Sequence, residues 1–332
     1  MKVRSLPPPS PVGREPHPPK PTRLTVLSNL ICSHKYIYKS SIYLLSIANR
    51  LPLYGRGRGE RPQTIMKIGI DVGISTTKIV GITSDLQVVS PTRIKATDPV
   101  TSLYGAFGKF LFDNKITLSD IEKVMITGVG AEYIEGDIYG LPTIRIPEFQ
   151  ADAQGAKFGS GLSRMITVSM GTGTTIIRVD GDDVQHLGGL GMGGGTLIGL
   201  SRLLLGTDDI HHIVELASQG NISNINLNIG DISPRPLPGL PLDTTASLFG
   251  KAGHDTRKED IALGIICTVI QTICSGTVLA SKGTDIKDFV MIGNLTLLPQ
   301  TREIFNSVET LYGVHFIIPK HSEYCTAIGC CV

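Results

Sequence analysis

The chain has 332 residues, of which 38 are glycine and none is tryptophan, and its formal net charge at pH 7 is +2. This length suffices for two domains, and the content of glycine and apolar residues suits a compact α/β enzyme. Residues 1–65 contain eleven Lys/Arg and two Asp/Glu, a balance of +9, so residues 66–332 carry −7. Because the larger part of the chain is acidic, we predict no nucleic-acid partner.

Residues 1–65 also differ in composition from the rest of the chain. Residues 7–21 are too rich in proline to form helix or sheet. The uncharged stretches between Arg23 and Leu53 are too short to span a bilayer, and the segment lacks the order of a secretory signal. We interpret residues 1–65 as a disordered or non-native extension, with a transit peptide as the alternative. We therefore place the true start at Met66 and predict no membrane partner.

Residues 66–160 are predicted to form an N-terminal lobe. Apolar, β-branched runs predict three sequential strands at residues 66–71, 78–83 and 87–95. Asp98 followed by Pro99 predicts a helix start, with a capping side chain and a proline in the first turn, and the helix should extend to about Asp113. Short strands are predicted at residues 123–127 and 143–146, followed by a helix at residues 149–159.

The turn between the first two strands contains the sequence I-G-I-D-V-G-I-S-T-T-K, residues 68–78. Asp71 would hold Mg²⁺ beside a nucleotide phosphate, and Gly73 would let the backbone approach it closely. Hydroxyl groups and one cation follow, and they would also bind phosphate: Ser75, Thr76, Thr77 and Lys78. The alternative is a plain hairpin in which Asp71 is only a turn residue.

Residues 161–332 repeat this order of elements and are predicted to form a C-terminal lobe. Strands are predicted at residues 165–169, 174–180 and 184–187, and later at 289–292 and 315–317. Helices are predicted up to Leu205, at residues 208–219, 260–281 and 298–310, and from Glu323. Residues 222–241 are rich in Asn, Pro and Gly, and we predict a surface excursion over the active site. The repeated order predicts two α/β lobes with a nucleotide cleft between them.

Two glycine-rich segments of the C-terminal lobe are candidates for binding the other side of the phosphate chain. The second hairpin turn is G-T-G-T, residues 171–174, where a plain hairpin would need only Asn-Gly. Residues 188–196, G-G-L-G-M-G-G-G-T, open a helix whose free first-turn amides would attract an anion. Their spacing fits neither a dinucleotide-binding fingerprint nor a Walker loop.

Two further polar residues stand at strand ends. Glu148 follows Pro147 at the end of a strand, a position that faces the cleft in an open α/β sheet, and its carboxylate could take a proton from a substrate hydroxyl. An exposed Glu at a helix start is the simpler interpretation of the spacing alone. Gly293-Asn294 closes a late strand, where Asn294 could line the adenine side or belong to a simple turn.

The chain resembles the type II pantothenate kinases, in the superfamily of sugar kinases, actin and heat-shock ATPases. The similarity covers about residues 66–329, and five segments carry it in the family's order. They are I-G-I-D-V-G-I-S-T-T-K, P-E-F-Q-A-D-A-Q-G from Pro147, M-G-T-G-T from Met170, G-G-L-G-M-G-G-G-T-x-x-G from Gly188, and M-I-G-N from Met291. The resemblance implies a duplicated, ribonuclease H-like fold with two lobes.

The resemblance also implies an activity, namely ATP- and Mg²⁺-dependent phosphorylation of the primary hydroxyl of pantothenate, which is the entry to coenzyme A synthesis. It implies a cytoplasmic homodimer joined partly through residues 260–281, with Glu148 as the general base and His186 and Gly189 on the substrate side. The implied ATP contacts are Asp71, Val72, Gly73, Ile74, Ser75, Thr76, Thr77, Lys78, Thr172, Gly194, Gly195, Thr196, Leu197, Ile198 and Asn294, with Asp71 also binding the metal.

One departure from the family and three other functions keep the assignment open at this point. Many family members carry an arginine where this chain has His186, and an imidazole is a poorer partner for a carboxylate than a guanidinium. The chain could instead be another small-molecule kinase, or an ATPase activator of a dehydratase, which would use Cys267 and Cys274 to bridge an iron–sulfur cluster. A non-catalytic regulator is the remaining alternative. The six cysteines lack the spacing of a zinc site.

Overall fold

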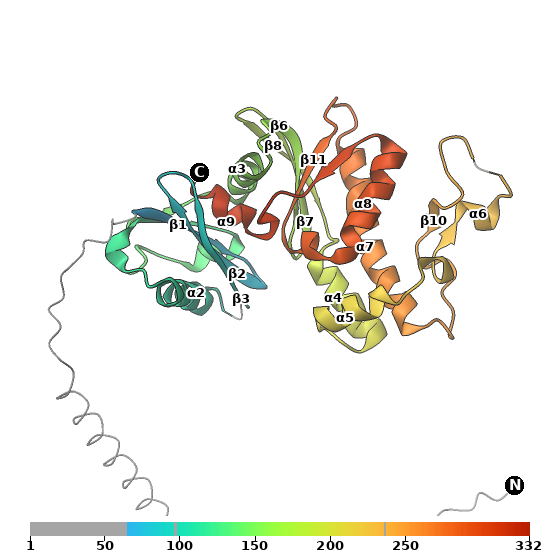
Figure 1. Ribbon diagram of the computed structural model, residues 1–332, viewed down its shortest axis with the longest axis horizontal. Coiled ribbons are helices and arrows are strands. Elements are labelled where there is room, and N and C mark those ends of the chain that lie inside the picture. The colour runs from blue at the N-terminus through green and yellow to red at the C-terminus, as the bar shows by residue number, and fades with distance from the viewer. Residues whose placement is uncertain (1–64, 96–97, 236) are drawn as a thin grey trace, which may run out of the picture. The chain divides into compact units, whose positions relative to one another are not determined.

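Alternating apolar residues in two sets of strands produce two five-stranded sheets in the computed structural model (Figure 1). The structure describes residues 65–95, 98–235 and 237–332, which all belong to one compact unit. Apart from Ile65, the extension predicted at residues 1–65 lies outside these described residues.

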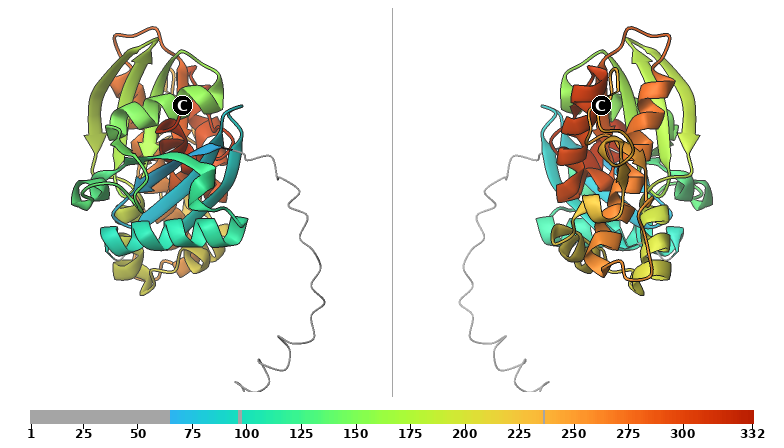
Figure 2. Two further views of the ribbon diagram at one scale, coloured as in Figure 1. Left: turned by 90° about the vertical axis from the view of Figure 1, so that its left-hand side faces the viewer. Right: turned by 90° about the vertical axis from the view of Figure 1, so that its right-hand side faces the viewer.

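The N-terminal sheet has the strand order β3-β2-β1-β4-β5. Strands β1 (Met66–Val72), β2 (Thr76–Thr83) and β3 (Val88–Lys95) form the predicted antiparallel meander, and β4 (Ile121–Thr127) and β5 (Thr143–Arg145) extend the sheet parallel to β1. Ile68, Ile70 and Val72 point to the face covered by α2 (Pro99–Asn114) (Figure 2, left). The cap of α2 is as predicted, because the Asp98 side chain accepts a hydrogen bond from the Thr101 amide at 2.7 Å.

The C-terminal sheet repeats this arrangement with the order β12-β11-β6-β7-β8. Its meander consists of β6 (Arg164–Met170), β7 (Thr174–Asp180) and β8 (Asp183–Leu190), and β11 (Asp288–Ile292) and β12 (His315–Ile317) run parallel to β6. One face shares a hydrophobic core with α4 (Gly194–Leu205), α5 (Ile210–Ser218), α7 (Lys258–Ala280) and α8 (Pro299–Tyr312), in which α5 packs on α7. Helix α7 alone among the described helices is long and apolar enough to cross a membrane, and 61% of its most apolar stretch is buried within the protein.

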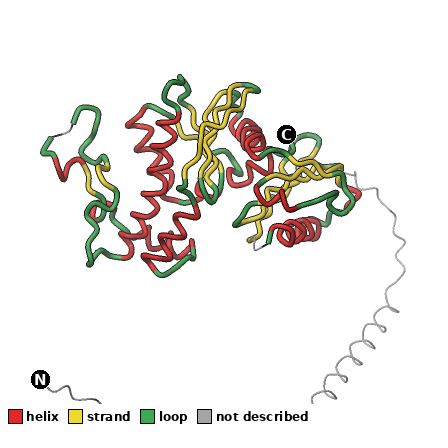
Figure 3. Tube along the Cα trace, turned by 180° about the vertical axis from the view of Figure 1, so that it is seen from behind, coloured by secondary structure: helices red, strands yellow, loops and turns green. Residues whose placement is uncertain are grey.

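Two helices lie between the sheets, as Figures 1 and 3 show from opposite sides. Helix α3 (Glu148–Ser160) packs on the C-terminal sheet, and the short helix α9 (Cys325–Gly329) packs on the N-terminal sheet. They cross so closely that a Cβ on Gly155 would lie 1.9 Å from the Cys325 carbonyl oxygen, and one on Gly329 would lie 1.8 Å from the Ala151 carbonyl oxygen. Each sheet is therefore covered by a helix from the other half of the chain, while the predicted lobe boundary at residue 160 stays a prediction.

The surface excursion lies elsewhere than we predicted. Strand β9 (Leu227–Asn228), the short helix α6 (Ile229–Ile232) and β10 (Thr245–Ser247) form a small unit against the start of α7, on the side of α7 and α8 away from β1 (Figure 1). The carboxylate of Asp260, in the first turn of α7, accepts hydrogen bonds from the Asn221 amide at 2.7 Å and from the Asn224 side chain at 3.1 Å. These bonds hold the excursion at this end of α7 rather than over the active site.

Candidate active site

The first hairpin turn requires glycine at its first position. The Gly73 amide donates to the Thr76 carbonyl at 3.1 Å, and a Cβ on Gly73 would lie 2.8 Å from that same oxygen. Ile74 and Ser75 are exposed at the tip and Thr76 is half-buried. The side chains of Val72 and Thr77 are fully buried. Val72 and Thr77 are both predicted nucleotide contacts, and with buried side chains they could contact a nucleotide only through their backbone atoms.

Asp71 and Lys78 form a buried ion pair at the base of this loop. The alternation of β1 points Asp71 away from the α2 side, and antiparallel pairing places it directly opposite Lys78. The Lys78 Nζ lies 3.4 Å from Asp71 Oδ2, and both residues are less than 10% exposed. In this structure the predicted phosphate-binding cation is therefore paired with the predicted metal ligand.

The structure brings the two glycine-hydroxyl turns together. The exposed hydroxyls of Ser75 and Thr172 lie 3.2 Å apart, although 97 residues separate them in the sequence. Gly128 also approaches Asp71, because a Cβ there would lie 2.7 Å from Asp71 Oδ1, and its φ of +88° favours glycine. Gly128 directly follows the strand predicted at residues 123–127, and the sequence indicated no role for it.

We predicted free backbone amides at the start of α4, but the structure shows two of them in hydrogen bonds. The Gly194 amide donates to the Gly171 carbonyl at 2.8 Å, and the Gly195 amide donates to the Thr172 carbonyl at 2.9 Å. The Thr196 hydroxyl donates to the Gly191 carbonyl at 2.7 Å. Leu197 is buried in the C-terminal core and Ile198 packs against it. These glycines thus hold the helix start against the second turn, and the Gly194 and Gly195 amides are not free donors.

Asn294 lies near the same turn and carries an unpaired buried oxygen. It follows Gly293, where a Cβ would lie 2.5 Å from the Met170 carbonyl at the end of β6. Its side-chain Oδ1 is buried and has no hydrogen-bond partner among the described residues. Because a buried acceptor of this kind is costly unless satisfied, the position suits a bound donor such as a ligand amine or a water molecule.

Glu148 is the first residue of α3 and is half-buried. Burial raises the pKa of its carboxyl group above the ordinary value, the nearby Asp71 carboxylate raises it further, and Lys78 opposes the increase. A carboxylate with a raised pKa is a stronger base. The structure thus places Glu148 in the same charged environment as the Asp71–Lys78 pair.

Sequence reasoning missed Asp152, which lies one turn after Glu148 on the same face of α3. Its side chain is 1% exposed, and its Oδ1 accepts a hydrogen bond from the Thr326 hydroxyl at 2.7 Å. Burial raises the pKa of Asp152 to about 7. The available signal was the i, i+4 spacing between Glu148, directly before the helix predicted at residues 149–159, and Asp152 within it.

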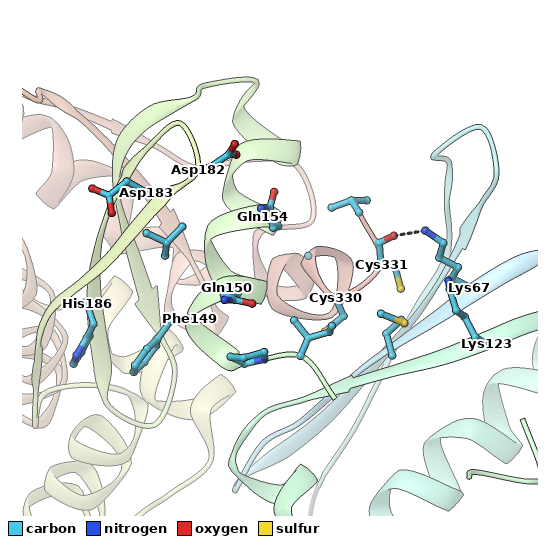
Figure 4. A pocket seen from close by; sticks show the side chains of 16 residues that line it. Lys67, Lys123, Phe149, Gln150, Gln154, Asp182, Asp183, His186, Cys330 and Cys331 are labelled. Carbon is cyan, nitrogen blue, oxygen red and sulfur yellow. Dashed lines mark hydrogen bonds between the residues drawn. The ribbon is translucent and has the colours of Figure 1, made fainter. Parts of the chain in front are cut away.

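A pocket of about 860 Å³ lies beside α3 (Figure 4). The rings of Phe149 and His186 stack in its wall, with centroids 4.4 Å apart and planes inclined by 9°. Gln150 and Gln154 of α3 also line it. Of the residues predicted on the substrate side, His186 borders this pocket, whereas Gly189 and the predicted base Glu148 are not among its lining residues.

The cysteines of the described residues are all buried, including Cys267 and Cys274. Both lie in α7 within the C-terminal core, where burial raises the pKa of Cys267 to about 12 and also raises the pKa of Cys274. Core thiols of this kind do not present ligands for a cluster that bridges two subunits.

Comparison with known proteins identifies the family. The model of the Fumble family matches residues 148–332, which is more than half of the chain. This chain belongs to the Fumble family of type II pantothenate kinases. A Staphylococcus epidermidis protein named type II pantothenate kinase is 29% identical over 280 residues, covering 80% of this chain and 98% of its own length.

Solved structures show the fold of this Fumble-family kinase. The activator of the 2-hydroxyisocaproyl-CoA dehydratase from Clostridium difficile, with bound ADPNP, is similar with a TM-score of 0.59 and 16% identity, covering 80% of this chain and 92% of its own. A ROK family glucokinase from Streptomyces griseus, in complex with glucose and AMPPNP, is similar with a TM-score of 0.53 and 12% identity. The match covers 80% of this chain and 98% of the glucokinase chain. The predicted two-lobed fold of the actin and sugar kinase superfamily is confirmed.

Proposed function

We propose that this protein transfers a phosphoryl group from ATP to the primary hydroxyl of pantothenate, the first step of coenzyme A biosynthesis. Membership of the Fumble family carries this proposal. The position of Glu148 supports it, because this carboxyl group of raised pKa lies near the Asp71–Lys78 ion pair, where the first hairpin turn begins and ends. The dehydratase activators share the fold, but the buried Cys267 and Cys274 do not favour their chemistry.

The residues present fit a nucleotide with Mg²⁺. The facing hydroxyls of Ser75 and Thr172 would bind phosphate oxygens, and the unpaired Asn294 oxygen would accept a hydrogen bond from the nucleotide. No group of three or more potential metal ligands occurs among the described residues, so Asp71 would share the ion with phosphates and water, as Mg²⁺ commonly allows. Mg²⁺·ATP would supply the phosphoryl group and a metal charge that stabilises it.

The chain's own residues would orient the acceptor and remove its proton. Glu148 would accept the proton of the acceptor hydroxyl as the oxygen bonds to phosphorus. The stacked Phe149 and His186 would border the remainder of the acceptor, and Phe149 directly follows Glu148 in the sequence. We further propose a cytoplasmic homodimer that uses α7, with neither a membrane nor a nucleic-acid partner. The family resemblance and the chain's composition support these points.

The experiment that tests the proposed function is a screen of acceptors. ADP release by the full chain would be measured with pantothenate, with a panel of sugars, and with no acceptor. We expect release that depends on pantothenate. Release that depends on a sugar would identify another small-molecule kinase, and release without any acceptor would favour an ATPase switch.

We predict that Asp71→Asn weakens Mg²⁺-dependent turnover and lowers thermal stability, while the protein still folds. The amide keeps the shape of the side chain but cannot supply the charge that Mg²⁺ needs, and it leaves the buried Lys78 without its ion pair. The measurement is turnover as Mg²⁺ is titrated, together with thermal unfolding. Normal turnover at limiting Mg²⁺ would show that Asp71 is only a turn residue.

A further inference from the structure

Asp152 is the most deeply buried carboxyl group near the site, and the proposed mechanism does not use it. It lies at the crossing of α3 with α9, where Thr326 donates to its Oδ1 at 2.7 Å. Its other oxygen, Oδ2, is buried and makes no hydrogen bond among the described residues. An ionised carboxylate usually satisfies both oxygens when it is removed from water, so this environment favours the protonated form.

The charges around Asp152 also favour its protonated form. Two other carboxyl groups act on it, Glu148 one turn earlier on α3 and Asp71 on β1. The cation of this neighbourhood, Lys78, is paired with Asp71. The thiols of Cys325 and Cys330 lie close by and remain neutral, because burial raises the pKa of Cys325 to about 12 and raises that of Cys330 as well.

The C-terminal sheet brings no compensating charge to this face of α3. Strands β7 and β11 turn apolar side chains toward α3, among them Ile177 and Val290, which pack with Ala153 and Ala156. Strand β6 contributes the Ser169 hydroxyl, which, like Thr326, favours the ionised form. Asp71, Glu148 and Asp152 thus share one ammonium group among the described side chains near them.

We propose that Asp152 is a positioning residue that holds the proton of a carboxyl pair, so that Glu148 alone carries the negative charge and serves as the base. This inference rests on the proposed function of Glu148. The division follows from depth, because Glu148 is half-buried whereas Asp152 is sealed beneath α9. When two carboxyl groups interact closely, the more buried one keeps its proton to higher pH.

A neutral Asp152 also protects the binding of an anionic nucleotide. Below about pH 7 the group is protonated and adds no charge, whereas above that pH its ionisation places another buried anion near the phosphate site. Repulsion would then weaken nucleotide binding by about three- to tenfold between pH 6 and pH 8.5. Binding of the nucleotide would in turn draw a proton to Asp152, by linkage.

The test compares the full chain with Asp152→Asn, which mimics the protonated form and keeps an acceptor for Thr326. Affinity for a non-hydrolysable ATP analogue with Mg²⁺ would be measured by calorimetry at pH 6 and pH 8.5. We expect the variant to match the wild type at pH 6 and to lack its loss of affinity at pH 8.5. Asp243→Asn makes the same chemical change at an exposed position and should retain the wild-type pH dependence.

Thr326→Val provides a second variant that leaves the carboxyl group in place. In the wild type, the hydrogen bond from Thr326 lowers the pKa of Asp152. Removing this hydrogen bond should therefore move the loss of nucleotide affinity to higher pH. Infrared spectra of the wild type should show a protonated carboxyl band at pH 6 that is missing from Asp152→Asn. This measurement does not depend on turnover, and thermal unfolding of each variant would confirm that it folds.

Turnover separates failure of this inference from failure of the proposed function. Wild-type protein that releases no ADP with pantothenate would overturn the acceptor assignment, while the calorimetric comparison would still report on Asp152. At pH 6 we expect kcat of Asp152→Asn within about threefold of the wild type. A loss of a hundredfold or more in a folded variant, or a pH dependence identical to that of the wild type, would overturn the role of Asp152.

Discussion

Glu148→Gln should lower kcat by roughly 10²–10⁴-fold, the usual contribution of a general base. The amide retains the length and shape of the side chain but cannot accept the proton of an acceptor hydroxyl. Nucleotide binding should survive, because the two glycine-hydroxyl turns that meet at Ser75 and Thr172 are unchanged. Pantothenate-dependent turnover and affinity for an ATP analogue are the two measurements that test this.

The pH dependence of the wild type adds a check on Glu148. The base must be ionised to act, and burial together with Asp71 raises its pKa, so activity should already fall at a pH above the ordinary carboxyl range. Near-normal turnover of the Gln variant would remove Glu148 from the mechanism. In that case Glu148 would be a helix-start carboxylate worth less than about 1 kcal/mol of stability.

Gly155→Ala should destabilise the fold by about 3 kcal/mol or more, because the crossing of α3 and α9 has no room for a methyl group. The added Cβ would lie 1.9 Å from the Cys325 carbonyl oxygen, a backbone atom that can move only if α9 shifts on the N-terminal sheet. The free energy of unfolding from urea titration measures this effect directly.

The matched control for this substitution is Gly108→Ala in α2. Gly108 lies within a helix like Gly155, but a Cβ there would meet nothing within 4 Å. Replacing a helical glycine by alanine should stabilise the protein by about 1 kcal/mol. Equal stability changes at the two positions would mean that the helix crossing is looser than the structure indicates.

Local patterns predicted most of the fold because most of the strands pair with neighbours in the sequence. The two meanders, the Asp98 cap of α2 and the long helix α7 all follow from periodicity and turn residues over short distances. The crossing of α3 and α9 could not be predicted in this way. Helix α9 has only five residues, and its closest contact is with a helix about 170 residues earlier.

The sequence could predict those parts of the candidate site in which the type of residue determines the chemistry. Asp71, Ser75, Thr172 and Glu148 come from motifs, and the structure brings both turns together and sets Glu148 beside Asp71. The motifs could not show which groups are already occupied. Lys78 is paired with Asp71, and the amides of Gly194 and Gly195 bind carbonyls of the second turn, because tertiary packing decides the partners of backbone amides and buried charges.

The exchange of α3 and α9 between the sheets has a consequence for dividing the chain. A cut after Ser160 would leave the first sheet without α9 and the second without α3, so each fragment would expose an apolar face that the intact protein buries. Neither fragment should then be soluble alone, whereas the two produced together should reassemble around the Gly155–Gly329 crossing. The protein is thus suited to serve as a split reporter, in which recovered turnover signals that two attached partners have met.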